Sequence, residues 1–288
     1  MQPSGVSIVG LGLVGKALSQ RLLAAGYAVT GWDTSETARA QASALGVTVA
    51  PGLAAVDAPV VLLSLPDSPT VCQVLWEEGL AGALPPGAVV LDTTTGSVQD
   101  AVTNHQRLAV RGVRFVDVTL SGSSDEIARG EAVALIGDTE AEASYRAVVK
   151  AFAARLFFLG QAGHGCLAKL VVNHVMGLNR AALAEGLALG EKAGLEPAKV
   201  LKVLQGTAAY SRVMDMKGQR MVAGDYTPAS RIRQHAKDVR LILDLAAEVG
   251  ARTPLEECHA ALLGEAIAAG WGEADNAALI EAFRHGKP

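Results

Sequence analysis

A glycine-rich turn near the start of the chain constrains its fold more than any other feature. Val6–Val9 predicts a short buried strand, Gly10–Gly15 reads Gly-Leu-Gly-Leu-Val-Gly, and Lys16–Ala25 predicts a helix. Asp33 ends the next predicted strand, 21 positions after Gly12 (33 − 12). A strand, this turn, a helix and an acidic residue about 20 positions later together predict a dinucleotide-binding unit, whereas the glycine turn alone would be weak evidence.

The three glycines have separate physical roles in such a unit. Gly10 permits a tight turn, Gly12 lets the backbone approach a pyrophosphate, and Gly15 lets helix and strand pack closely. The free backbone N–H groups at the helix N-terminus, around Leu13 and Val14, would then bind the pyrophosphate. An ordinary glycine turn is the alternative, and the flanking strand and helix make it less favoured.

Asp33 bears on the choice of cofactor. Its carboxylate would accept hydrogen bonds from the ribose hydroxyls of an adenosine and would repel a 2′-phosphate, so the sequence predicts NAD rather than NADP. Thr34, Ser35 and Arg39 follow closely and could soften this preference, which leaves NADP open.

Apolar runs separated by helical stretches continue through the first half of the chain. They are Ala28–Trp32, Pro59–Leu65, Ala88–Asp92, Arg114–Val118 and Ala132–Gly137, with Arg155–Leu159 closing the series. This alternation predicts an α/β fold with a mostly parallel, doubly wound sheet of the Rossmann type. Ligands of such sheets bind beyond the carboxyl ends of the strands. Small polar residues follow three of these ends, namely Ser64, Thr93–Thr95 and Ser121–Ser124.

The second half of the chain predicts helices only. We expect them at roughly 165–193, 197–206, 210–222, 228–249, 254–269 and 275–284. Thr227 would cap the fourth of these helices, with Pro228 at its first position. The change of pattern divides the chain into a dinucleotide-binding domain, 1–162, and an all-helical substrate and oligomerisation domain, 163–288. The long first helix would join the two.

Lys169 and Asn173 stand out on that long helix. They are four residues apart and therefore share one helical face, among apolar neighbours. A lysine seldom enters an apolar environment unless something pairs with it or uses it. A lysine that extends to solvent and an asparagine that bonds a neighbouring backbone group are the structural alternative.

Composition excludes several classes of function. The net charge of −4 and the lack of a basic stripe argue against nucleic acid as a partner. No apolar run reaches the roughly 18 residues of a membrane helix. The N-terminus has no charged leader, so we expect a cytoplasmic protein. The six scattered histidines show no ligand spacing, which predicts that no metal is bound. The helices of the second half are too apolar to stay solvated, which predicts a homodimer or homotetramer.

The three cysteines, Cys72, Cys166 and Cys258, are odd in number and widely spaced. They predict reduced thiols rather than a disulfide framework or a zinc site. Cys166 lies three residues before Lys169, so a redox role and a simple packing role both remain open.

Five blocks in order make the chain similar to a known family. They are Gly10–Gly15, Asp92–Thr95, Asp117–Gly122 with Gly130, Gly163–Asn173, and Lys237-Asp238. Together they resemble the β-hydroxyacid dehydrogenase family, which includes 3-hydroxyisobutyrate dehydrogenase and tartronate semialdehyde reductase. The resemblance covers essentially the whole chain.

The resemblance implies a reaction and its residues. Lys169 matches the family's catalytic lysine, a general acid when a carbonyl is reduced and a base in reverse, and Asn173 matches the asparagine that orients the substrate. Hydride transfer leaves charge on oxygen, which a positioned ammonium can stabilise and protonate. Ser121, Gly122 and Ser123 match the segment that holds the substrate carboxylate.

Further matches concern the cofactor. Thr95 corresponds to a contact at the nicotinamide end, and Leu65-Pro66 to the segment under the ribose. Lys237 corresponds to the lysine that closes over the cofactor site from the helical domain. Taken alone, Lys237-Asp238 would be interpreted as an ordinary solvated charge pair.

Departures from the family pattern concern the substrate. The usual Asp-Ala-Pro-Val-Ser-Gly-Gly reads Asp-Val-Thr-Leu-Ser-Gly-Ser over Asp117–Ser123, so Thr119 replaces the proline and Ser123 the second glycine. Val172 replaces the first of two paired asparagines. Ser230 stands where many members have an aromatic residue, which predicts a roomier or more polar substrate pocket.

The leading hypothesis is an NAD-dependent oxidoreductase acting on a short 3-hydroxy acid or its semialdehyde. One alternative is an NADPH-preferring reductase of glyoxylate, succinic semialdehyde or tartronate semialdehyde. A second alternative is a non-catalytic nucleotide-binding relative, because a fold does not prove a function.

Overall fold

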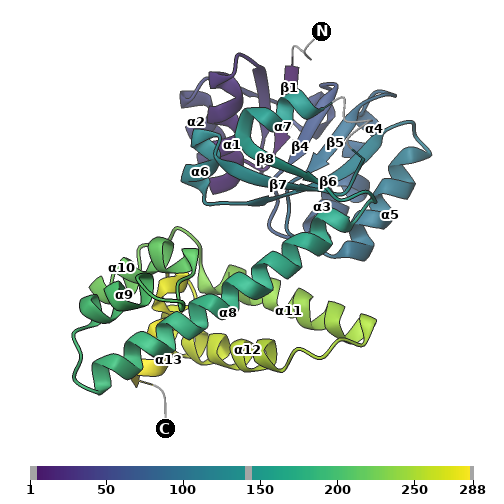
Figure 1. The fold of residues 1–288 in the computed structure, drawn as a ribbon. Helices are drawn as coiled ribbons and strands as arrows, with labels where there is room; N and C mark the ends of the chain where they lie inside the picture. The colour runs from purple at the N-terminus through teal and green to yellow at the C-terminus, as the bar shows by residue number, and fades with distance from the viewer. Residues whose placement is uncertain (1–4, 140–144, 286–288) are drawn as a thin grey trace. The chain divides into compact units, whose positions relative to one another are not determined.

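A computed structural model describes residues 5–139 and 145–285 of the chain. These residues form two compact units, one ending at Lys169 and the other beginning at Leu170 (Figure 1). The division falls inside helix α8 (His164–Lys192), whose first turn is part of the first unit. The sequence predicts the domain boundary after residue 162, just before this helix begins.

The first unit is built on one sheet of eight strands. The strands are β1 (Gly5–Val9), β2 (Ala28–Trp32), β3 (Thr48–Val49), β4 (Val60–Leu63), β5 (Val89–Asp92), β6 (Arg114–Ser121), β7 (Ala132–Ile136) and β8 (Ala153–Phe158). Their order is β3-β2-β1-β4-β5-β6-β7-β8, and every neighbouring pair is parallel except β6–β7. The first six follow the doubly wound order, which confirms the predicted fold class.

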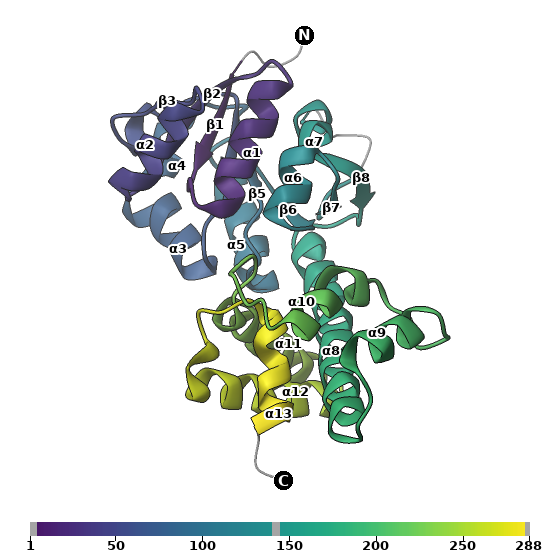
Figure 2. The same ribbon diagram turned by 90° about the vertical axis from the view of Figure 1, so that its left-hand side faces the viewer.

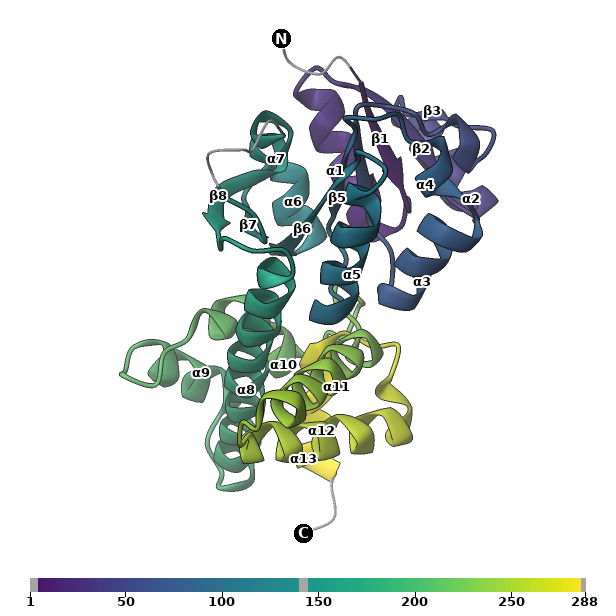
Figure 3. The same ribbon diagram turned by 90° about the vertical axis from the view of Figure 1, so that its right-hand side faces the viewer.

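Helices cover both faces of this sheet. They are α1 (Leu13–Ala24), α2 (Glu36–Ala44), η1 (Leu53–Ala55), α3 (Ser68–Cys72), η2 (Gln73–Glu77), α4 (Leu80–Ala83), α5 (Val98–Ala109), α6 (Ser124–Arg129) and α7 (Arg146–Phe152). Figure 2 shows α1, α6 and α7 together over one face, and Figure 3 shows α3 and α5 over the other. In β4, Val60 and Leu62 join the first of two apolar cores, while Val61 and Leu63 join the second. Strands buried on both faces explain their unbroken apolar runs.

Strand β6 is three residues longer than predicted, because it ends at Ser121 and not at Val118 (121 − 118). The extension is stabilised by the antiparallel partner β7, which pairs Leu135 with Thr119 and Val133 with Ser121. The predicted polar turn therefore begins inside a regular strand. The two-residue strand β3 was not predicted, since so short an element has no readable period.

The regular elements among the described residues of the second unit are all helices, as predicted. After α8 come α9 (Pro197–Gln205), η4 (Met214–Gly218), α10 (Gln219–Ala223), α11 (Ile232–Val249), α12 (Pro254–Ala266), η5 (Ile267–Trp271), η6 (Asn276–Leu279) and α13 (Ile280–His285). Helices α11 and α12 lie side by side (Figure 1). Two apolar clusters hold the unit together, one around Leu187 of α8 and one around Ile232 and Val239 of α11.

Helix α11 begins at Ile232, and the expected start at Thr227-Pro228 is wrong. Arg231 occupies the N-cap position and makes no side-chain cap hydrogen bond. The residues before it are held as a loop by a carboxylate far along the chain, Asp275, which the local sequence does not reveal.

The described residues contain neither a membrane-spanning helix nor a cluster of metal-ligating side chains. No helix among them has the length and apolar character required to cross a membrane. Within the same ranges, 5–139 and 145–285, no three His, Cys, Asp or Glu side chains gather as metal ligands would.

Candidate active site

The glycine-rich turn has the close contacts that require glycine. Gly10 has a φ of +92°, and a Cβ placed on it would lie 2.2 Å from the carbonyl oxygen of Ser64 at the end of β4. A Cβ on Gly15 would lie 1.9 Å from the carbonyl oxygen of Gly10. Helix α1 therefore sits directly against the turn, and a side chain at either position would displace it.

Gly12, by contrast, borders open space. A Cβ there would meet no atom within 4 Å, and Gly12 is the N-cap of α1 without any side-chain cap. The first N–H groups of α1, including those of Leu13 and Val14, have no partner within the helix. A pocket of about 200 Å³ adjoins them, lined by Leu11, Gly12, Leu13, Lys16, Ser35, Thr37, Ala38 and Gln41. A positive helix end beside such a pocket fits the adenosine and pyrophosphate of a dinucleotide.

Asp33 borders the same turn. Its carboxylate accepts hydrogen bonds from the N–H groups of Leu11 and Ser35, each at 2.7 Å. An ionised carboxylate has about four acceptor positions, so two remain for ribose hydroxyls. Arg39 donates to the carbonyl oxygens of Asp33 at 2.6 Å and Thr34 at 3.0 Å. This guanidinium is thus engaged by the backbone of the turn.

Of the three threonines that follow β5, Thr93 and Thr94 are buried and hold neighbouring strand ends together, whereas Thr95 is half-buried. The Thr93 hydroxyl donates to the carbonyl oxygen of Leu63 at 2.7 Å, and the Thr94 hydroxyl accepts from the N–H of Leu65 at 3.2 Å. These bonds join the ends of β4 and β5. Thr95 lies beyond them and is half-buried, as is Leu65, while Pro66 is exposed.

Ser121 and Gly122 lie at the end of β6, whereas Ser123 caps the helix that follows. Ser121 is the half-buried last residue of the strand, and Gly122 has a φ of +149°. Ser123 forms a capping box at the start of α6: its N–H donates to Glu126 at 2.7 Å and its hydroxyl accepts from the Glu126 N–H at 3.2 Å. The structure thus gives Ser123 a capping role at the start of α6, and its predicted substrate contact stays a prediction.

Lys169 and Asn173 are both buried on α8, with exposed fractions of 9% and 3%. The Nδ2 group of Asn173 donates to Oδ2 of Asp238 at 2.9 Å. Its Oδ1 atom is also buried and has no hydrogen-bond partner among the described residues. A buried acceptor without a donor is costly, so this oxygen is suited to receive a hydroxyl group from a ligand.

Asp238 is part of the candidate site, although the sequence patterns did not indicate it. It is buried at 8% exposure, and Nζ of Lys237 lies 3.1 Å from its Oδ1 atom, so the solvated charge pair expected from the dipeptide alone is wrong. His235, Val239 and Ile242 of the same helix are buried as well. This spacing places Asp238 on the inner face of α11, and it is the signal that could have identified the residue.

A set of ionisable residues, the half-buried His174 and the buried His235, Glu256 and His259, lies close to Asn173 in the second unit. Nδ1 of His174 is 2.8 Å from the fully buried Glu256 carboxylate. A Cβ on Gly177 would lie 2.7 Å from the His259 ring and 2.8 Å from the His235 ring. Helix α8 therefore approaches these imidazoles as closely as glycine permits. These residues lie far apart in the sequence, so no local pattern indicated that they cluster.

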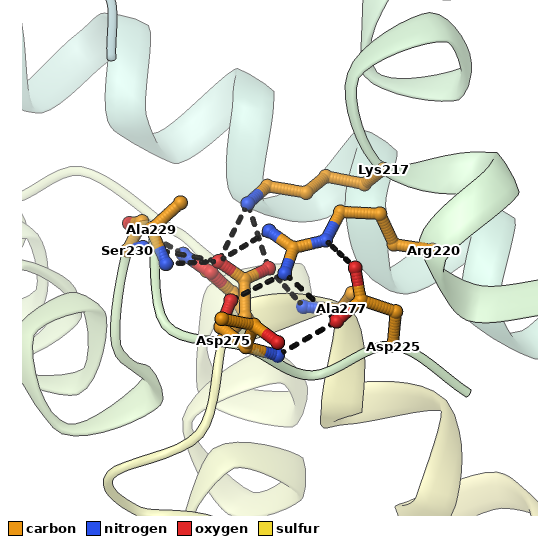
Figure 4. A network of polar contacts seen from close by, with 9 residues as sticks. Lys217, Arg220, Asp225, Ala229, Ser230, Asp275 and Ala277 are labelled. Carbon is orange, nitrogen blue, oxygen red and sulfur yellow. Dashed lines mark hydrogen bonds and ion pairs between the residues drawn. The ribbon is translucent and has the colours of Figure 1, made fainter. Parts of the chain in front are cut away.

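Ser230 belongs to a loop that Asp275 holds in place (Figure 4). The buried Asp275 carboxylate accepts two hydrogen bonds from Lys217, at 2.7 and 2.9 Å, and lies 3.3 Å from Arg220. It also accepts from the N–H groups of Ala229 at 3.1 Å, Ser230 at 3.0 Å and Ala277 at 3.0 Å. Burial alone would raise the pKa of Asp275, but Lys217 and these N–H groups hold it below its ordinary value. Ser230 itself is exposed on this rigid frame.

Cys166 is a packed side chain. It is 2% exposed and belongs to the apolar core behind β4 and β5. Burial, with the nearby carboxylates of Asp117 and Asp92, raises the pKa of its thiol well above the ordinary value. A thiol that stays protonated is a poor nucleophile, so the packing interpretation of Cys166 is favoured over a redox role.

Comparison with known families accounts for almost the whole chain. Residues 5–160 match the model described as the NAD binding domain of 6-phosphogluconate dehydrogenase. Residues 163–283 match the model described as NAD-binding of NADP-dependent 3-hydroxyisobutyrate dehydrogenase.

Individual relatives align over nearly their full length. The chain is 31% identical to an L-threonate dehydrogenase of Cupriavidus necator, covering 96% of this chain and 95% of the relative. It is 30% identical to glyoxylate/succinic semialdehyde reductase 1 of Arabidopsis thaliana, covering 97% and 98%. Its fold matches the crystallised 3-hydroxyisobutyrate dehydrogenase of Mycobacterium tuberculosis with a TM-score of 0.89 at 28% identity, covering 99% and 100%.

The fold and these matches define a dehydrogenase that uses a nicotinamide dinucleotide, NAD or NADP. The chain belongs to the 3-hydroxyacid (β-hydroxyacid) dehydrogenase family, as the resemblance in its sequence predicted. It is accordingly an NAD(P)-dependent dehydrogenase or reductase. Each of these three relatives is named as an enzyme.

Proposed function

We propose that this enzyme interconverts a short 3-hydroxy acid and its semialdehyde, with NAD as the cofactor and Lys169 as the general acid and base. The observation that supports this most directly is the inner face of α8. It carries a buried lysine and, one turn later, a buried asparagine whose Oδ1 atom lacks a partner within the described chain. Together they offer a proton and an acceptor to one hydroxyl-bearing ligand.

Lys169 supplies the proton chemistry. A nicotinamide cofactor, when bound, would supply the hydride chemistry at the substrate carbon. The Lys169 ammonium stabilises the negative charge that develops on the substrate oxygen and then protonates it. In the opposite direction the neutral amine removes the hydroxyl proton. Burial of the side chain keeps this charge interaction from being screened by water.

Asn173 is oriented for its role by Asp238. Because Asp238 accepts a hydrogen bond from Nδ2, the amide is fixed with Oδ1 facing away from that carboxylate. Oδ1 is then available to accept a hydrogen bond from the substrate hydroxyl. Asp238 also neutralises part of the charge of Lys237, which we propose as a cofactor contact.

The substrate carboxylate is proposed to bind at Ser121 and Gly122. A serine hydroxyl and backbone N–H groups at the end of a strand form charge-assisted hydrogen bonds with a carboxylate. Ser123 follows directly and is proposed to contact the substrate as well, through a hydroxyl that also caps α6. We propose Ser230 as the polar boundary of the substrate site, because its loop is rigidly held while the residue itself is exposed.

The other proposed cofactor contacts come from residues of the first unit. We propose that Gly10, Gly12 and Gly15 shape the pyrophosphate site and that the N–H groups of Leu13 and Val14 bind it. Asp33 would hold the adenosine ribose. Thr95 would contact the nicotinamide end and Leu65-Pro66 would lie under the ribose, since all three residues lie beyond the carboxyl ends of β4 and β5.

A panel of turnover assays tests the proposal. The candidates are 3-hydroxyisobutyrate, L-threonate, tartronate semialdehyde, glyoxylate and succinic semialdehyde, each measured with the NAD and the NADP form of the cofactor. We expect kcat/KM to be at least about tenfold higher with NAD(H), which corresponds to about 1.4 kcal/mol. The Asp33 carboxylate disfavours a 2′-phosphate, and Arg39 is engaged by backbone carbonyls. A clear NADPH preference would contradict this role of Asp33.

The alternative is a reductase of glyoxylate or succinic semialdehyde that prefers NADPH. The Arabidopsis relative, named for these two substrates, supports it as strongly as the L-threonate dehydrogenase supports the first proposal. The polar Ser230 favours neither aldehyde nor hydroxy acid by itself. The same panel separates the two, because only the alternative predicts the best kcat/KM for an aldehyde with NADPH.

We also propose that the enzyme is a homodimer or homotetramer through its helical unit. Large apolar side chains are exposed there on three segments, Leu189 of α8 at 69%, Leu195 at 60% and Val203 of α9 at 62%. Burying them between copies would remove this apolar surface from water. Light scattering at micromolar concentration should give at least twice the 29.6 kDa chain mass. A mass of one chain at that concentration would refute the proposal.

A further inference from the structure

Strand β6 carries three polar residues on one face. Side chains alternate along a strand, so Asp117, Thr119 and Ser121 all point to the same side of the sheet. Asp117 and Thr119 are completely buried, while Ser121 is half-buried at the end of the strand. The two buried members bind the first turn of α8, the helix that carries Lys169.

Asp117 serves as the cap of that helix. Its Oδ1 accepts from the N–H of Gly163 and its Oδ2 from the N–H of Cys166, both at 2.9 Å. The first N–H groups of a helix have no partner within it, and a carboxylate there also complements the helix dipole. Burial raises the pKa of the Asp117 carboxyl above its ordinary value, and the N–H groups of Gly163 and Cys166 oppose that rise.

Thr119 adds a second bond to the same turn. Its hydroxyl donates to the carbonyl oxygen of Gly165 at 2.8 Å, with a longer approach of 3.5 Å to the carbonyl oxygen of Leu135. A proline at this position, as in the family pattern, has neither a hydroxyl nor an N–H group. The Thr119 bond is therefore an attachment that the proline could not make.

The attachment leaves the helix little freedom to shift. A Cβ on Gly165 would lie 2.6 Å from the carbonyl oxygen of Leu135 and 2.7 Å from that of Asp117. A Cβ on Gly137 would lie 2.2 Å from Oδ1 of Asp117. The helix backbone thus rests directly on the strands, and hydrogen bonds at 163, 165 and 166 fix its register. Lys169 follows Gly165 by one turn on the same helical face.

We propose that Thr119, together with Asp117, is a positioning residue. It fixes the position of the Lys169 ammonium relative to Ser121 and Gly122, the proposed binding residues for the substrate carboxylate. The proposal rests on the proposed function of Lys169 and extends it. Strand β6 ends at the proposed carboxylate-binding residues and also holds the first turn of α8. The proposed carboxylate site and the helix that carries Lys169 are therefore fixed to one rigid element. Misplacing a catalytic group by about 1 Å costs about 100-fold in rate.

Thr119→Val tests this proposal, because it keeps the branched shape and removes the hydroxyl. We expect kcat to fall by about 10-fold to 100-fold, while KM for the acid and the dissociation constant of NADH change by less than about twofold. The limb of the pH–rate profile that depends on Lys169 should move. Thr119→Ser, which keeps the hydroxyl, should restore most of kcat. If Thr119→Val does not fold, Thr119→Cys replaces it, since a thiol is a much weaker donor.

A matched control removes an equivalent bond elsewhere. The buried Ser19 hydroxyl donates to the carbonyl oxygen of Gly15 at 2.8 Å, within α1. Ser19→Ala should lower the melting temperature about as much as Thr119→Val and leave kcat near wild type. Unchanged kcat in Thr119→Val, or an equal loss of kcat in Thr119→Val and Thr119→Ser, would overturn the positioning role. A Lys169→Met variant that remains active would instead overturn the proposed function itself, so the two failures are distinguishable.

Discussion

Replacing Lys169 with methionine should lower kcat by between about 100-fold and about 10 000-fold, the range typical of general acid–base groups. Methionine preserves the apolar stem and the buried volume but cannot donate a proton or carry charge. The loss should appear in kcat and in kcat/KM alike, because the interaction forms in the transition state. Steady-state kinetics with the best substrate of the panel measure it, and NADH titration should show unchanged cofactor binding.

The control for this variant is a lysine on the surface of the helical unit. Nζ of Lys199 in α9 pairs with Glu196 at 2.8 Å, and its side chain is 80% exposed. Lys199→Met should leave both kcat and KM unchanged. Retention of most of the turnover in Lys169→Met would show that another group transfers the proton. Lys169→Arg is informative as well, because arginine keeps the positive charge but does not release its proton.

Replacing Asp275 with asparagine should lower the free energy of unfolding by about 3–5 kcal/mol, the usual cost of removing one partner of a buried ion pair. The substitution removes the carboxylate paired with Lys217 in a mostly buried site, and it removes one of the two carboxylates near Arg220. It also weakens the acceptor for the N–H groups of the Ser230 loop. Urea unfolding followed by circular dichroism measures the change.

The pH dependence of this effect has a defined sign. The pKa of Asp275 is lowered in the folded chain, so its contribution to stability is complete above the unfolded value of about 3.9. That contribution is lost as the pH falls through the folded pKa. The difference between wild type and Asp275→Asn should therefore be constant near neutrality and shrink below about pH 4.

Asp225 provides the matched control for Asp275. It belongs to the same network, 3.3 Å from Arg220, but it is exposed to water (Figure 4). Asp225→Asn should change stability very little, since exposed ion pairs contribute little. Equal destabilisation by the two substitutions would mean that burial of Asp275 is not the cause.

The dinucleotide-binding half of the chain was predictable from sequence because its signals are local. Gly10, Gly12 and Gly15 lie within six residues, and the contacts that require glycine involve the turn itself and the adjacent end of β4. Asp33 is one helix away, at a distance set by the unit itself. The sequence pattern predicts this turn correctly because the contacts that require glycine are local.

The features that the sequence concealed depend on contacts between distant residues. Thr227-Pro228 has the local chemistry of a helix start, but Asp275 holds the following residues as a loop. Asp238 resembles a surface charge until α8 packs against α11 and Asn173 bonds to it. In both cases a tertiary hydrogen bond decided against the expectation.

The capping of α8 by Asp117 also bears on the order in which the protein assembles. A chain is synthesised from its N-terminus, and domains fold as units in that direction. Asp117 precedes Gly163 by 46 positions, so the acceptor that completes the helix leaves the ribosome before the helix does. The sheet can thus serve as a template on which the first turn of α8 nucleates, which avoids the usual cost of starting a helix alone. The residue that orders the first turn of α8 is then also the one that gives its folding a starting point.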